Sequence, residues 1–190
     1  MPDRITDALT RRRLGGAVLL LAGIAVAAIV LWPSGSDRTA TKRLPVRIVS
    51  VPPLGLGFAH PRTWKRTVSG KVIRVTSPDG TLVLLFSSPF ERPGRGFAKA
   101  EAKSALLKQL APAKIVRDAP SRLGARNVPS FEVTGERGDK LVRALVLVDS
   151  SKWRTYVVTM LTGENPSRRR VNEARRILGT VRFGKPRRIR

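Results

Sequence analysis

The longest uninterrupted apolar stretch of the chain is residues 14–32, which begin at Leu14 and end at Trp32. At the rise of an α-helix, nineteen residues measure about 28 Å, close to the hydrocarbon thickness of a bilayer. Three arginines at 11–13 precede the run, and Pro33 follows it. The pattern predicts an uncleaved signal anchor that crosses a membrane once, with Trp32 at the interface.

Basic residues on both sides of the apolar run bear on its orientation. The three arginines at 11–13 abut the run, whereas a large trailing domain tends to be translocated regardless of its charge. We therefore expect residues 1–13 in the cytoplasm and the domain outside. Two alternatives stay open: cleavage at Ser34-Gly35-Ser36, which would release the domain, and a twin-arginine signal around residues 10–14. The basic residues behind the run are more dispersed: Arg38, Lys42, Arg43 and Arg47.

Beyond the apolar run, short segments of alternating apolar and polar residues predict strands. Residues 33–53 have the composition of a linker, although the alternation in 46–51 suits a short edge strand. Asp79-Gly80 stands between two alternating segments and is a strong signal for a β-hairpin. The last three long strands predict an antiparallel meander. The predicted strands after the linker are residues 56–60, 71–77, 81–87, 114–117, 130–134, 140–149, 152–161 and 181–183.

Two segments have the period of an amphipathic helix. The first is residues 97–110, ended by Pro112, and the second is residues 167–178, ended by Gly179. We expect the first to face a sheet through Phe97, Ala100, Ser104, Leu107 and Ala111. We expect the second to face inward through Val171, Ala174, Ile177 and Leu178.

The order of these elements is strands, helix, strands, helix and strand. It predicts an α+β fold in which an antiparallel sheet is flanked by helices in an α/β/α sandwich. The domain is expected to span residues 54–184, followed by a basic tail at 185–190. This length suits one domain with one core.

The chain is strongly basic: its 190 residues include 37 Lys and Arg against 13 Asp and Glu, a formal charge of +24. Most of the excess lies beyond Leu44, so the domain itself carries it. Such a field favours polyanions, namely nucleic acid, anionic lipid or a phosphate-bearing polymer. A general compositional bias toward Arg, Ala, Gly, Pro and Val remains the alternative explanation.

Residue types that support catalysis or metal binding are scarce. There is no cysteine, and His60 is the only histidine. A pair of histidines for a metal is therefore excluded, and a Ser-His-acid triad would have to use His60. The carboxylates are scattered, and we expect most of them to pair with nearby arginines. Trp64 and Trp153 are expected to close the core rather than to form stacking platforms. We predict no catalytic residue, no metal and no cofactor.

One local conflict points to a binding site. Arg168, Arg169 and Arg170 occupy the first turn of the second helix, where the helix dipole disfavours cations by a few tenths of a kcal/mol each. Arg175 and Arg176 follow one to two turns later. With the free backbone N–H groups of a helix start, these five arginines could bind phosphate, sulfate or an acidic partner. A solvated arginine-rich face is the alternative.

Several motifs resemble those of PsbP-like domains. Residues 58–64, Phe-Ala-His-Pro-Arg-Thr-Trp, are similar to the opening signature of that family, and residues 75–80, Val-Thr-Ser-Pro-Asp-Gly, match its hairpin. Residues 153–159 and 177–183 resemble its late aromatic strand and its closing helix and strand. The family includes the PsbP subunit of photosystem II, the nuclear import factor Mog and exported bacterial proteins of the LpqN type. Its members mostly bind or assist other macromolecules, so the resemblance implies a fold but no residue roles.

From these observations we expect a membrane-anchored, non-enzymatic bacterial binding module. Its partner in the cell envelope would be an acidic protein or an anionic polymer. Two alternatives remain: an enzyme accessory or weak hydrolase on the same fold, and a nucleic-acid-binding protein. The first would require a pocket with a perturbed carboxylate, and the second is difficult to reconcile with export.

Overall fold

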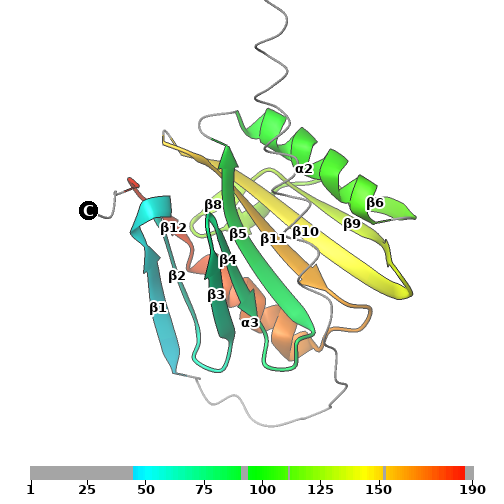
Figure 1. The fold of residues 1–190 in the computed structure, drawn as a ribbon, viewed down its shortest axis with the longest axis horizontal. Coiled ribbons are helices and arrows are strands. Elements are labelled where there is room, and N and C mark those ends of the chain that lie inside the picture. The colour runs from blue at the N-terminus through cyan, green and yellow to red at the C-terminus, as the bar shows by residue number, and fades with distance from the viewer. Residues whose placement is uncertain (1–44, 91–93, 111, 152, 187–190) are drawn as a thin grey trace, which may run out of the picture.

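The structure, a computed structural model, describes residues 45–90, 94–110, 112–151 and 153–186. Within this part of the chain, a seven-stranded sheet forms the centre of the domain (Figure 1). All neighbouring strands in it are antiparallel. In spatial order they are β3 (Lys65–Ser69), β4 (Val72–Thr76), β5 (Leu82–Phe90), β11 (Thr155–Thr162), β10 (Lys140–Ser150), β9 (Ser130–Arg137) and β6 (Ala113–Arg117).

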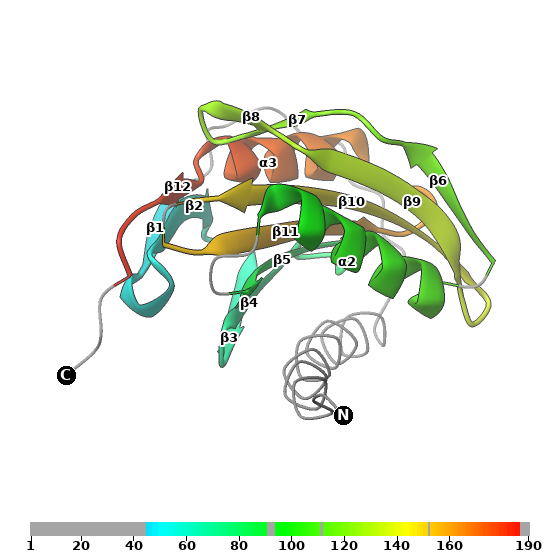
Figure 2. The same ribbon diagram turned by 90° about the horizontal axis from the view of Figure 1, so that it is seen from above.

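Successive side chains of the central strands point to opposite faces and enter two separate cores. On β5, Leu84 belongs to one core and Leu85 to the other. Helix α2 (Arg95–Gln109) covers one face, and helix α3 (Arg168–Gly179) covers the other, as Figure 2 shows from above. The predicted α+β fold, with an antiparallel sheet flanked by helices, is therefore confirmed. Each layer buries its own apolar residues, so there are two cores rather than the single one expected.

A second sheet lies beside α3 on the same face of the main sheet. It contains β1 (Val46–Val51), β2 (Leu56–Pro61) and β12 (Arg182–Phe183), and a 3-10 turn, η1 (Pro52–Leu54), connects the first two strands. β1 is an edge strand, as its flanking prolines predict. Val49 of this strand is 2 % exposed and enters the core that α3 also covers. The folded domain therefore includes residues whose composition suggested a linker.

The Asp79-Gly80 hairpin between β4 and β5 is confirmed. Gly80 has a φ of 70°, which glycine adopts without strain, and Ser77 N donates to Leu82 O at 2.9 Å. The meander of β9, β10 and β11 is confirmed as well. Three strands were not expected: β3, and the hairpin of β7 (Ser121–Leu123) and β8 (Arg126–Val128).

The expected inward stripe of the first helix is wrong in its first half and right in its second, where Leu107 packs against the core. Phe97 is 45 % exposed, and Ala100 and Ser104 are exposed too, whereas Ala98 and Ala102 are buried. The reason is steric: small side chains let α2 approach the sheet closely, and the bulky Phe97 points away. For α3 the expected stripe is confirmed, since Ala174, Ile177 and Leu178 are buried and Val171 packs against their core. Ala111 lies outside the described residues.

No helix in the described part of the chain has both the length and the apolar character needed to span a bilayer. The predicted anchor, residues 14–32, lies outside the described residues, as does the tail from residue 187 onward.

Candidate functional site

The first turn of α3 is where the sequence placed a cluster of cations without acidic neighbours. Ser167 caps this helix, because its Oγ accepts a hydrogen bond from Arg170 N at 3.3 Å. No acidic residue occupies the first turn. The cap satisfies one backbone N–H group but leaves the cost of the three arginines next to the helix dipole unexplained.

Arg170 points inward and is held by two carboxylates. Its Nε donates to Asp79 Oδ2 at 3.0 Å, and its Nη1 donates to Glu173 Oε2 at 2.8 Å. Its side chain is only 17 % exposed. Because Asp79 lies in the β4–β5 turn, this arginine ties the start of α3 to the main sheet. The unfavourable position of Arg170 next to the helix dipole is thus offset by its ion pair with Asp79, a residue distant in the sequence.

Glu173 is the centre of this network. It is 8 % exposed, and its Oε2 accepts a hydrogen bond from Trp64 Nε1 at 2.9 Å. Its Oε1 accepts one from Arg169 Nε at 3.1 Å. Trp64 is itself 2 % exposed, so the expectation that it closes the core is confirmed. A buried carboxylate with three donors is fully satisfied and rigid.

The pKa values of both carboxylates are shifted toward the charged form. Burial alone would raise the pKa of Asp79, but hydrogen bonds from Ser77, Arg170 and Thr81 outweigh it and lower the pKa to about 2. Burial likewise opposes the charge of Glu173, and its hydrogen bonds from Trp64 and Arg170 lower its pKa. A general acid working near neutral pH needs a raised pKa instead, so these two groups suit a structural role.

The five arginines that the sequence singled out do not form one cluster. Arg170 forms ion pairs with Asp79 and Glu173, and Arg169 forms one with Glu173 at the edge of the network. The other three lie on the exposed side of the helix and have no ion-pair partner among the described residues: Arg168, Arg175 and Arg176. Anion binding by these residues stays a prediction.

Two open hollows flank the C-terminal segment and share Phe183, Gly184 and Lys185 in their walls. Their volumes are about 390 and 540 Å³. Trp153 is half-buried in the wall of the smaller one, with Lys185 Nζ 5.3 Å from the centre of its ring. The core-closing role expected for Trp153 therefore holds only in part.

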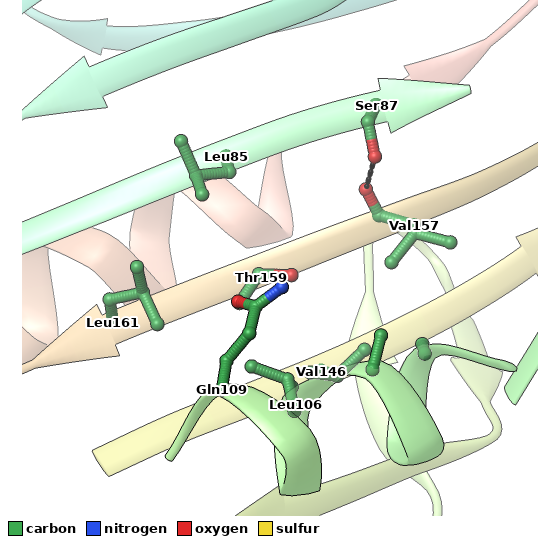
Figure 3. Close-up of a pocket in the computed structure, with 10 residues that line it drawn as sticks. Leu85, Ser87, Leu106, Gln109, Val146, Val157, Thr159 and Leu161 are labelled. Carbon is green, nitrogen blue, oxygen red and sulfur yellow. Dashed lines mark hydrogen bonds between the residues drawn. The ribbon is translucent and has the colours of Figure 1, made fainter. Parts of the chain in front are cut away.

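An apolar crevice lies between α2 and the main sheet (Figure 3). Leu106 and Gln109 of α2 face Leu85 and Thr159 of the sheet across it. Its volume of about 40 Å³ is far below the several hundred Å³ of a typical ligand site. This crevice has room for a few water molecules but not for a substrate.

Side chains that could bind a metal or act in catalysis are not grouped together in the described part of the chain. Among the described residues, no group of three His, Cys, Asp or Glu side chains could hold a metal. His60, expected at a strand end, lies in β2 at 2 % exposure, and its Nδ1 is 2.8 Å from Pro61 O. Its Nε2 is buried without a hydrogen-bond partner among the described residues. Burial lowers the pKa of His60 below the ordinary 6.5, and the positive charges of Arg66 and Arg47 lower it further.

Three further carboxylates among the described residues pair with nearby cations: Asp118, Glu132 and Asp149. Asp149 is buried and accepts from Arg95 Nη2 at 2.8 Å, with Arg126 at 3.4 Å on its other oxygen. This pairing connects the start of α2 to the β7–β8 hairpin. Asp79 was the residue that sequence reasoning missed: its Ser-Pro-Asp-Gly motif indicated a turn, and nothing in the sequence indicated its partner on α3.

Comparisons with known proteins bear on the fold. No family model matches the chain, and no curated protein matches its sequence. A crystal structure from Bacteroides thetaiotaomicron matches with a TM-score of 0.50 and 14 % identity. The match covers 76 % of this chain and 50 % of that one, so the chain spans about half of its length.

Two further solved structures belong to the group that the sequence motifs resemble. Cyanobacterial PsbP (CyanoP) from Synechocystis matches with a TM-score of 0.49 and 12 % identity, over 78 % of this chain and 98 % of its own. LpqN of Mycobacterium tuberculosis, described as involved in cell envelope biogenesis, matches with 0.46 and 12 %, over 74 % and 91 %. Both are structures to which this chain is similar in its arrangement of strands and helices. At this identity the likeness extends to the fold alone.

Proposed function

We propose that this chain is a membrane-anchored, non-enzymatic binding module of the cell envelope. Residues 14–32 hold it in the membrane, and the domain lies outside the cytoplasm. Its partner is an acidic protein or an anionic envelope polymer. The length and apolarity of the anchor segment and the formal charge of +24 support this proposal.

The observation that carries the proposal is the exposed face of α3. Arg168, Arg175 and Arg176 project from it without an ion-pair partner among the described residues, while Arg170 satisfies the acidic residues beneath. Uncompensated arginines destabilise a helix start slightly, and their fork-shaped guanidinium groups suit phosphate and carboxylate ligands. A structural role therefore accounts for Arg170, and the helix dipole favours Arg176 in the last turn of α3, but neither explains Arg168 or Arg175.

Within the described residues, the placement of the carboxylates supports a binding role. Asp79 and Glu173, with lowered pKa values, are engaged in ion pairs, and the crevice beside α2 is too small for a substrate. The two larger hollows beside the C-terminal segment have no carboxylate among their lining residues. A hydrolase on this fold would need a carboxylate with a raised pKa next to a larger cavity.

The test uses the full chain in detergent micelles, with polyglutamate and polyphosphate as probes. The variant Arg168→Gln, Arg175→Gln, Arg176→Gln is expected to weaken binding by about tenfold or more. A matched control removes three exposed cations elsewhere: Lys108→Gln, Lys114→Gln, Arg117→Gln. Equal weakening by both variants would mean that only the overall charge matters, and unchanged binding would refute the arginine face.

A further inference from the structure

Segments that are far apart in the sequence converge at the end of the domain where β1 begins. Arg62 N donates to Pro45 O at 3.0 Å, so the start of β1 lies beside the β2–β3 turn. The hydrogen bond from Trp64 to Glu173 ties this turn to the first turns of α3. The ion pair of Arg170 adds the β4–β5 turn to the same end, which is the lower side of Figure 1.

Exposed cations gather at this end. Five of them come from the β2–β3 turn, β3 and the start of α3, and we name them the basic end: Arg62, Lys65, Arg66, Arg168 and Arg169. Within the described residues, only Arg169 among them has an ion-pair partner, Glu173. The carboxylates of Asp79 and Glu173 are occupied by Arg170, so they do not neutralise the others. Glu164 is exposed near the same end and leaves it with a positive balance.

Two exposed apolar side chains lie on the strand that begins here. Ile48 is 83 % exposed and Val46 is 59 % exposed. Val49 of the same strand points into the core and is 2 % exposed. Both therefore lie on the outer face of β1. An exposed pair of β-branched apolar residues beside a group of cations is the composition of a surface that rests on a membrane interface.

The stretch of chain between the apolar run and the folded domain is short. Thirteen residues, 33–45, separate the apolar run from β1. Even fully extended, thirteen residues reach no more than about 45 Å. This step rests on the proposed function, because it takes residues 14–32 as the membrane anchor. The basic end is then the part of the domain held nearest to the bilayer.

We propose that the basic end lies against the anionic headgroups of the membrane that anchors the chain, with Val46 and Ile48 at the interface. Each cation near an anionic surface strengthens binding about fivefold. The tether supplies an effective concentration in the millimolar range, so even a weak contact holds the domain down. Lipid phosphate is then a ligand of Arg168 in addition to the acidic protein or polymer of the proposed function. The arginines at the start of α3 serve this contact at a small cost to the helix.

The experiment uses the full chain in liposomes, and the lack of cysteine allows unique labelling. Thr63→Cys, in the β2–β3 turn, receives a fluorophore, and lipids with a nitroxide on the headgroup act as quenchers. Ala125→Cys is the matched control, because Arg126 pairs with Asp149 near the other end of β10. Both positions are exposed. In liposomes with phosphatidylglycerol, we expect quenching at 63 to exceed that at 125 severalfold.

Four outcomes decide the proposal. The difference should disappear in pure phosphatidylcholine, in 1 M salt, where the screening length is about 3 Å, and in the variant Arg62→Gln, Lys65→Gln, Arg168→Gln. Equal quenching at both positions in a chain that resists alkaline extraction overturns the orientation but leaves the anchor standing. A chain released by alkaline extraction overturns the anchor and, with it, this inference. If the triple variant weakens polyglutamate binding without changing the quenching, a soluble polyanion is the partner instead.

Discussion

Arg170 and Asp79 are separated by 91 positions in the sequence, yet Arg170 Nε donates to Asp79 Oδ2 at 3.0 Å. The contact joins the start of α3 to the turn of the β4–β5 hairpin. Asp79 Oδ1 also accepts hydrogen bonds from Ser77 Oγ at 2.5 Å and Thr81 N at 3.1 Å, so one carboxylate closes the turn and holds the helix. The Ser-Pro-Asp-Gly motif therefore has a tertiary role in addition to its role in the turn.

Asp79→Asn should destabilise the domain by about 1–2 kcal/mol, because it removes the charge that Arg170 faces and one acceptor for the turn. The free energy of unfolding in urea measures this. Asp139→Asn, in the exposed β9–β10 turn, is the matched control and should change stability by less than about 0.5 kcal/mol. An equal effect of the two substitutions would contradict the role of Asp79.

Stability should also fall in acid because of Asp79. Its pKa of about 2 in the folded state lies below the ordinary 3.8, so the unfolded chain binds a proton first as the pH drops. The stabilisation is complete above about pH 4 and is lost progressively toward pH 2. In Asp79→Asn this part of the pH dependence should be missing. A slope between pH 4 and 2 that is the same in both proteins would refute the assignment.

His60 should give a second pH dependence near neutrality. Its pKa in the folded state is lowered, whereas in the unfolded chain it is the ordinary 6.5, so the unfolded state gains the proton first. Stability is therefore complete above about pH 6.5 and declines as the pH falls below it. Since His60 is the only histidine, His60→Gln should flatten the thermal stability between pH 7 and 5. A decline that persists unchanged in this variant would show that another group is responsible.

Gly55→Ala should detach the C-terminal segment. Gly55 has a φ of 63°, and a Cβ there would lie 2.3 Å from Gly184 O. The hydrogen bond from Gly184 N to Gly55 O, 2.7 Å, would break as well. Gly70→Ala is the control, since it has a similar φ of 54° but open space around it. We expect a loss of about 1 kcal/mol for Gly70→Ala and at least twice that for Gly55→Ala, measured by thermal unfolding.

Local patterns predicted the elements that carry their own signal. The Asp79-Gly80 pair indicated the hairpin. β10 and β11 are apolar on both faces, which indicated central strands. β3 was not predicted from the sequence. All five of its residues are exposed, so no alternation of buried apolar and exposed polar residues marks it as a strand. The first half of α2 was misjudged because Ala98 and Ala102, not Phe97, are buried against the sheet.

The candidate site was only partly predictable for a related reason. The unfavourable position of the arginines at the start of α3 is visible in the sequence, since it depends on a few neighbouring residues. The partners of Arg170 and Trp64 lie 91 and 109 positions away along the chain. Such contacts depend on the tertiary fold, and a single sequence contains no local signal for them.

The proposed function requires the domain to lie outside the cytoplasm while the chain stays in the membrane. The direct measurement is protease treatment of intact spheroplasts that produce the full chain with a C-terminal tag, followed by the same treatment after lysis. We predict that the domain is digested in intact spheroplasts and that its membrane-held N-terminal fragment remains with the pellet. A domain that is protected until lysis would contradict the account.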